Sequence, residues 1–150
     1  GHDIACHERE HAEQGHGVTA VDISPEALAR GKKKYSHLSN ITWIEADLFK
    51  MGREHFQSYD VIFEHTCYCA IDPSKRSEVV KLWKQFLVPK GHLLGVFFAM
   101  ERRLGPPFGG TEWELRERLK KSFHFIFWGR WHQSVHNRDG KEFLVYAQMR

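Results

Sequence analysis

An apolar strand that ends on a carboxylate and leads directly into a capped helix is the feature that most constrains this fold. Residues 18–22 read VTAVD, and Ser24 follows as a good N-cap. Pro25 suits the first helical turn, and Glu26 complements the positive end of the helix. In open α/β sheets the ligand lies beyond the carboxyl ends of the strands, and an acid that ends the second strand commonly binds a ribose diol. Asp22 is therefore the first candidate contact for a nucleoside-bearing cofactor.

Strands and helices alternate along the rest of the chain. Further strands are expected at 41–46, 59–64, 92–99, 123–132 and 142–148, and helices at 3–14, 25–35, 112–121 and from Asp72 to about Leu87. The strand at 59–64 is of the continuous apolar kind that is buried on both faces, and 89–91 is expected to form a turn. The NRDG sequence at 137–140 predicts a closing hairpin. This order predicts an α/β fold with a mostly parallel sheet and one antiparallel strand.

The length and composition exclude several classes of protein. The 150 residues are enough for one core, so we expect residues 1–150 to form a single domain. The net charge of +3 is small and dispersed, which gives no reason to expect a nucleic-acid partner. No apolar run is as long as a membrane span, and we expect neither a membrane partner nor a secretory leader. Cys6, Cys67 and Cys69 are odd in number and poorly spaced for a structural bridge, which favours a cytoplasmic location.

Residues 7–11 match the pattern His-Glu-x-x-His. On a helix His7 and His11 share one face and could bind zinc, with Glu8 as a base for water. The alternative is a pair of histidines on a solvated helix, because Arg9 and its acidic neighbours keep this segment polar. No third ligand follows at a convincing spacing. We therefore expect surface histidines and no metal, with a zinc hydrolase as a remaining alternative.

Seven blocks of the sequence resemble one family. They are 1–3 (GHD), 21–28, 47–49 (DLF), 63–73 (FEHTCYCAIDP), 87–91, 105–108 (GPPF) and 138–142 (RDGKE). In this order they resemble the class I S-adenosylmethionine-dependent methyltransferases, and within them the thiopurine and thiol S-methyltransferase group. The resemblance implies a Rossmann-like methyltransferase sheet, mostly parallel with a C-terminal antiparallel hairpin and helices on both faces. It also implies S-adenosyl-L-methionine as the cofactor.

The resemblance assigns roles on the cofactor side. Asp22 would hold the ribose hydroxyls, and Ile23 would pack on the adenine. Asp47 and the backbone of Leu48 would meet the amino edge of the adenine. The remaining expected cofactor contacts are Gly1, at the end of the family's glycine-rich turn, and Thr66, at the end of the fourth strand.

On the acceptor side the resemblance points to Glu64 and His65 as candidate catalytic residues. They could be a general base and its neighbour, or a satisfied pair at a strand end, and the sequence leaves both open. Methyl transfer is an in-line displacement that depends chiefly on holding nucleophile and methyl about 3–3.5 Å apart. A thiol acceptor ionises readily, so a strong base is optional.

Three further sets of side chains bear on the acceptor side of the site. The family's acceptor pocket is bordered by the loop that corresponds to Pro106, Pro107 and Phe108. Cys67 and Cys69 could be nucleophiles or metal ligands, but we expect buried residues that line the cofactor pocket. Phe97, Phe98 and the aromatic residues of 123–132 could include an aromatic acceptor pocket, but we expect most of them in the core, on alternating faces of the last strands.

By the same resemblance, the family's first strand and its glycine-rich turn should precede Gly1. That strand lies between the second and fourth strands, so without it two strand edges are unpaired. We expect a fragment, or a homodimer formed through those edges. The predicted activity is methyl transfer from S-adenosylmethionine to the sulfur of a small thiol or thiopurine-like acceptor, with halides as further acceptors. The alternative is a non-catalytic remnant or S-adenosylmethionine-binding module.

Overall fold

The computed structural model of the chain describes residues 16–65, 67–99, 105, 108–131 and 141–150. The chain separates into two compact units, residues 1–51 and residues 52–150, and each is described by itself. The expected helix at 3–14 and the turn at 137–140 lie outside the described residues. The organisation as a single domain stays a prediction. Within the described ranges, no helix is long and apolar enough to span a bilayer.

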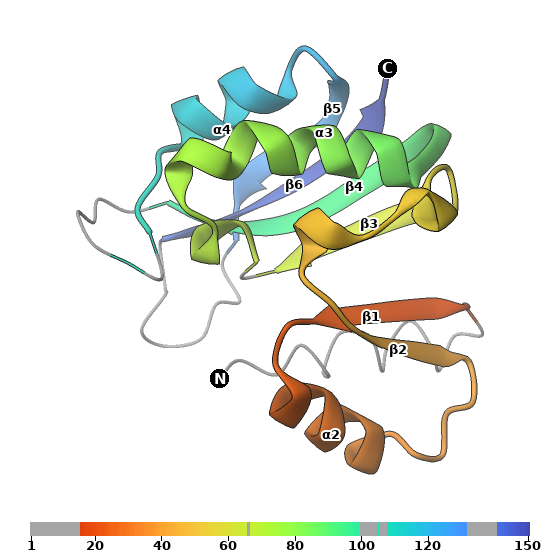
Figure 1. Ribbon diagram of the computed structural model, residues 1–150. Helices are drawn as coiled ribbons and strands as arrows, with labels where there is room; N and C mark the ends of the chain where they lie inside the picture. The colour runs from red at the N-terminus through yellow and green to blue at the C-terminus, as the bar shows by residue number, and fades with distance from the viewer. Residues whose placement is uncertain (1–15, 66, 100–104, 106–107, 132–140) are drawn as a thin grey trace. The chain divides into compact units, whose positions relative to one another are not determined.

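The described part of the first unit, residues 16–51, is a two-stranded parallel sheet with an α-helix and a short 3-10 helix (Figure 1). Its elements are β1 (Val18–Asp22), α2 (Pro25–Lys34), β2 (Ile41–Glu45) and the short 3-10 helix η1 (Leu48–Lys50). β1 and β2 run parallel, and Asp22 lies opposite Glu45 at their carboxyl ends. The expected strand, helix and second strand are therefore confirmed, with ends that differ by one residue at most.

α2 begins and packs as its sequence predicts. The Ala27 N–H donates to the Ser24 hydroxyl at 3.2 Å, which confirms Ser24 as the N-cap. Gly31 is buried where the helix meets the ring of Trp43 in β2, and a Cβ at this glycine would lie 2.6 Å from that ring. A glycine is therefore required by close packing and not by backbone conformation. The core of this unit consists of Ala20, Tyr35 and Ile41, with Val18, Leu38 and Trp43 packed against it.

The second unit is built on a four-stranded sheet in the order β3-β4-β6-β5. Its elements are η2 (Arg53–His55), β3 (Tyr59–His65), η3 (Tyr68–Ala70), η4 (Pro73–Lys75), α3 (Arg76–Phe86), β4 (Leu87–Phe98), α4 (Glu112–Leu119), β5 (Phe123–Arg130) and β6 (Glu142–Met149). β3 runs parallel to β4, whereas β6 runs antiparallel to both β4 and β5. Figure 1 shows α3 lying along this sheet with α4 beside it. The expected antiparallel last strand is confirmed.

α3 buries the apolar stripe that its sequence predicts. Val79, Val80, Trp83 and Phe86 are all buried. The ring of Trp83 meets that of Phe97 in β4 edge to face, with centroids 6.3 Å apart. Aromatic pairs of this geometry add to the free energy gained from burial alone. This packing holds α3 against β4, one of the two inner strands of the four-stranded sheet.

β3 is less buried than its sequence predicts. Among its residues only Glu64 is buried, and Val61 is 50% exposed. Among the described residues β3 pairs with β4 alone, so it lies at the edge of the described four-stranded sheet. The expectation of burial on both faces was therefore wrong for this structure, because an apolar run alone does not distinguish a central strand from an edge strand.

Two irregularities in the sheet were not expected. β4 begins at Leu87 and not at His92, and the expected turn at 89–91 is an interruption within it, where Lys90 has φ 64°. In β5 the register shifts between Phe125 and Phe127, and Phe127 is 50% exposed. A bulge of this kind turns side chains to the other face. The aromatic residues of β5 therefore do not alternate simply between core and solvent.

We predict that Gly31→Ala destabilises the first unit. Alanine favours a helix by about 1 kcal/mol over glycine, but forcing a methyl against a packed ring costs about 1–3 kcal/mol. With the Trp43 ring atom 2.6 Å from the new Cβ, we expect the clash to prevail. Urea unfolding should show a net loss of about 1 kcal/mol. In a Trp43→Leu background the same substitution should become neutral or stabilising, and a stabilised Gly31→Ala single variant would contradict the packing.

Candidate functional site

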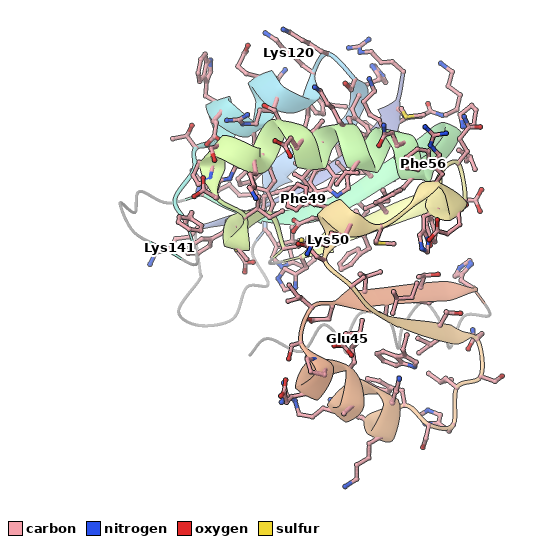
Figure 2. The ribbon with its side chains drawn as sticks, viewed as in Figure 1. Glu45, Phe49, Lys50, Phe56, Lys120 and Lys141 are labelled. Carbon is pink, nitrogen blue, oxygen red and sulfur yellow. The ribbon has the colours of Figure 1, made fainter. Side chains whose placement is uncertain are left out.

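Two carboxylates lie where the parallel strands of the first unit end. Asp22 is the last residue of β1, and its Oδ1 accepts the Ser24 N–H at 2.8 Å. Asp47 follows β2 by two residues, and its Oδ1 accepts the Phe49 N–H at 3.0 Å (Phe49 is labelled in Figure 2). The Ala46 N–H donates to the Asp22 carbonyl at 3.1 Å and ties the two strand ends together. Within residues 16–51, neither carboxylate makes a further hydrogen bond, so each keeps an oxygen for a ligand.

An exposed apolar side chain stands beside these carboxylates. Ile23 directly follows Asp22 and is 69% exposed, although isoleucine is among the residue types most often buried. Leu48 follows Asp47 and is half-buried. Carboxylate oxygens suit hydroxyl and amino donors, and Ile23 offers contact to a flat apolar ring. The residues present therefore fit an adenosine group.

Glu64, the last residue but one of β3, carries a buried carboxyl. Glu64 is 3% exposed, and its Oε1 accepts the Tyr68 N–H at 2.6 Å. Burial raises the pKa of Glu64 to about 7, although the backbone N–H groups of Tyr68 and Cys67 act in the opposite direction. A carboxyl with such a pKa can exchange a proton near neutral pH, as a general base or acid must.

His65 is paired with a carboxylate that the sequence did not assign. Its Nε2 lies 3.3 Å from Oε2 of Glu142, the first residue of β6. Glu142 is 2% exposed, whereas the His65 side chain is 27% exposed. Sequence reasoning gave Glu142 no role, although it lies in one of the blocks that carry the family resemblance. Apart from that block, the sequence marks Glu142 only as a charged residue at the start of a mostly apolar strand.

Phe108, an expected acceptor-side residue, is attached by hydrogen bonds to η3, which follows β3, and to the start of α3. Its N–H donates to the carbonyl of Cys69 at 2.6 Å. Its own carbonyl lies 3.5 Å from Nη2 of Arg76, whose Nη1 donates to the Gly109 carbonyl at 2.9 Å. The structure therefore brings Phe108 to the segment that follows Glu64 and His65.

Arg76 is the buried cation that organises this attachment. It is 1% exposed, its Nη1 lies 3.2 Å from both carboxylate oxygens of Glu114, and its guanidinium stands 4.6 Å from the ring centre of Tyr68. Its Nε and the Tyr68 hydroxyl are buried without a partner among the described residues. Sequence reasoning did not single out Arg76, since its hydrogen-bond partners lie more than 30 residues away along the chain.

The other expected site residues fall into three groups. Gly1, Thr66, Pro106 and Pro107 lie outside the described residues, as does the motif at 7–11. Cys69 is buried as expected, but Cys67 is exposed, so the expectation of two buried cysteines was wrong for Cys67. It follows β3 in an exposed turn, where a side chain can point to solvent. In the described part of the chain, no cluster of three or more His, Cys, Asp or Glu could hold a metal ion.

In sequence the chain is similar to sulfur methyltransferases. A family model described as thiopurine S-methyltransferase (TPMT) matches residues 8–144. Probable thiol methyltransferase 2 of Arabidopsis thaliana is 32% identical over 93 residues, which cover 60% of this chain and 40% of that protein. Thiocyanate methyltransferase 1 of the same plant is 26% identical over 110 residues, 71% of this chain and 46% of that protein. The matches thus span less than half of these curated relatives.

In fold the chain is similar to solved methyltransferases. One is N-methyltransferase NodS from Bradyrhizobium japonicum WM9, solved in complex with S-adenosyl-L-homocysteine. The TM-score is 0.72 at 19% sequence identity, and the match covers 87% of this chain and 65% of that chain. This likeness confirms the expected Rossmann-like methyltransferase fold.

We predict that Glu64→Gln removes a pH dependence of stability. Because burial raises the pKa of Glu64 from 4.5 to about 7, the folded protein binds this proton more tightly than the unfolded chain does. The free energy of unfolding should therefore fall as pH rises from 4.5 to about 7, by roughly 3 kcal/mol from this group. Glutamine keeps an oxygen for the Tyr68 N–H but does not titrate. Urea unfolding between pH 4.5 and 8 should lose this decrease in Glu64→Gln and keep it in the exposed control Glu117→Gln.

We predict that Arg76→Lys loosens the attachment of Phe108. Lysine cannot reach the Glu114 carboxylate and two backbone carbonyls together, so we expect a loss of about 3 kcal/mol in the free energy of unfolding. Arg118→Lys is the matched control, because Arg118 also bonds Glu114, at 3.0 Å, but is 27% exposed. It should cost less than about 1 kcal/mol. Equal losses in the two variants would show that the burial of Arg76 adds nothing to its contribution to the free energy of unfolding.

Proposed function

We propose that this chain, which belongs to the thiopurine S-methyltransferase family, transfers a methyl group from S-adenosylmethionine to the sulfur of a small thiol or thiopurine-like acceptor. The two Arabidopsis relatives are named for thiol and for thiocyanate as acceptors, and both are sulfur nucleophiles. Their names support sulfur as the atom that is methylated. We also propose that the protein functions in the cytoplasm, as its cysteine pattern favours.

The observation that carries this proposal is the pair of carboxylates at the ends of β1 and β2, with exposed Ile23 between them in sequence. In the proposed complex Asp22 binds the ribose hydroxyls and Ile23 packs on the adenine, while Asp47 and the Leu48 backbone meet its amino edge. Gly1 and Thr66 are proposed as further contacts. When bound, S-adenosylmethionine supplies an electrophilic methyl group on a positively charged sulfur.

The residues after β3 are proposed to form the acceptor side. Glu64 and His65 end that strand, and Phe108 is attached beside them through Cys69 and Arg76. Pro106 and Pro107 complete the proposed border of the pocket. These residues orient the acceptor sulfur, which contributes to rate mainly through alignment with the methyl group.

A homodimer formed through strand edges is a further proposal. Among the described residues β1 pairs only with β2, and β3 pairs only with β4, so each has an edge without a partner strand. Unpaired backbone groups at such edges favour pairing with another chain. Light scattering coupled to size exclusion should then give twice the 17.6 kDa of one chain.

We predict that Asp22→Asn weakens binding of S-adenosyl-L-homocysteine at least tenfold in calorimetric titration of the chain. Asparagine keeps an oxygen for the Ser24 N–H but loses the charge that strengthens hydrogen bonds to the ribose, worth about 1.5–3 kcal/mol. Asp60→Asn, at an exposed position of β3, should bind as the unchanged chain does. A folded, monodisperse unchanged chain that does not bind this ligand would overturn the proposed function. Binding without methyl transfer to any thiol would leave a binding module.

A further inference from the structure

We propose that Glu142 is a positioning residue for His65, and that the His65–Glu142 pair takes the proton from a neutral thiol acceptor. This inference rests on the proposed methyl transfer. The proposal gives a function to Glu142, a buried carboxylate to which the sequence assigned none. It also separates the acceptors into those that need this pair and those that do not. A neutral thiol needs to lose a proton, whereas halides and thiocyanate are already anions.

The sheet brings the pair together from distant parts of the chain. His65 is the last residue of β3 and lies opposite Val96 of β4, and Glu142 is the first residue of β6 and lies opposite Phe98 of the same strand. The two side chains meet at 3.3 Å although 77 positions separate them in sequence. Their positions are therefore set by the hydrogen bonds of β4 to both neighbours.

The burial of the two partners differs in a way that suits proton transfer. Glu142 is 2% exposed, so its carboxylate is held away from water, while the His65 side chain is 27% exposed and can reach an acceptor. A buried carboxylate on one ring nitrogen fixes the tautomer and stabilises the imidazolium that forms. In the tautomer that donates its Nε2–H to Glu142, Nδ1 is the basic nitrogen of the ring, and we assign to it the proton of the acceptor.

Among the described residues, the charged side chain that meets His65 is acidic. Glu142 faces it from β6, and the buried Glu64 precedes it in β3, while Gly95 and Val96 of β4 are uncharged. Arg130 of β5 is ion-paired with Glu112 at 3.4 Å. Lys141, labelled in Figure 2, is exposed. The Glu142 carboxylate at this position repels an approaching anion, and the low dielectric of a protein interior strengthens that repulsion.

The proposed step moves a proton from the acceptor to His65 and a methyl group to the acceptor sulfur. The S–H bond of the acceptor breaks, the proton passes to Nδ1 of His65, and the electron pair stays on sulfur. That pair forms the new bond to the methyl carbon while the bond from this carbon to the positively charged sulfur of the methyl donor breaks. Its electrons remain on the departing thioether. The imidazolium then returns its proton to water.

The test compares 2-mercaptoethanol, a neutral thiol, with thiocyanate as acceptors of the whole chain across pH 5–9. Glu142→Gln should lower kcat for the thiol at least tenfold and move the acid limb of its pH profile to lower pH, because the charge that stabilises the imidazolium is gone. The rate with thiocyanate should stay the same or rise. Glu78→Gln makes the same chemical change at an exposed residue of α3 and should alter neither acceptor.

A second measurement needs no methyl transfer. In NMR titration of the histidine rings without cofactor, the midpoint of the His65 titration should move to lower pH in Glu142→Gln. If that variant does not fold, His65→Gln should show the same selective loss with the thiol. Equal effects on thiol and thiocyanate, or an unmoved midpoint, would overturn the proposal. A moved midpoint in a chain that methylates neither acceptor would support the pair and refute the proposed function instead.

Discussion

β4 forms hydrogen bonds with β3 along one edge and with β6 along the other, and the proposed acceptor side depends on that double pairing. β3 delivers Glu64 and His65 at its end, and β6 begins with Glu142. Neither strand could place its residues without β4 between them. The packing of α3 on β4 through Trp83 and Phe97 then fixes the helix whose first residue, Arg76, attaches Phe108. One strand therefore sets both the pair of titratable side chains and the segment beside them.

The parts of the fold that sequence predicted are those specified by neighbouring residues. β1 and α2 were predictable because a strand, an N-cap at Ser24 and a helix-starting proline follow one another within a few positions. The failures involve partners that are distant in sequence. Burial of β3 depends on whether another strand lies beside it, and its apolar run does not carry that information. The bulge between Phe125 and Phe127 likewise depends on how β5 pairs with β6.

The cofactor side and the acceptor side of the candidate site differ in the same way, because the first depends on neighbouring residues and the second on partners that are distant in sequence. Asp22 and Asp47 could be predicted because a carboxylate at the end of a strand is a local pattern with a general meaning in parallel sheets. His65 could be named as a candidate by resemblance, but its partner Glu142 could not, since only the antiparallel pairing of β6 with β4 brings it there. A cofactor that is bound by strand ends is thus easier to infer from sequence than the acceptor it modifies.

The described core holds three carboxyl or guanidinium side chains, and each meets the cost of burial in a different way. Arg76 keeps its charge and satisfies it with two backbone carbonyls, the Glu114 carboxylate and the Tyr68 ring. Burial of Glu64 instead raises its pKa to about 7, so that the proton neutralises it. Glu142 faces the imidazole of His65.

Replacing buried ionic groups by apolar residues of similar shape often leaves stability unchanged or improves it, so stability alone does not explain why three such groups lie in one small core. Arg76 has a structural reason, since it holds a segment in place. Glu142 contacts the partly exposed His65, and in the proposed reaction its position serves the proton that a neutral acceptor must release before it can attack the methyl group.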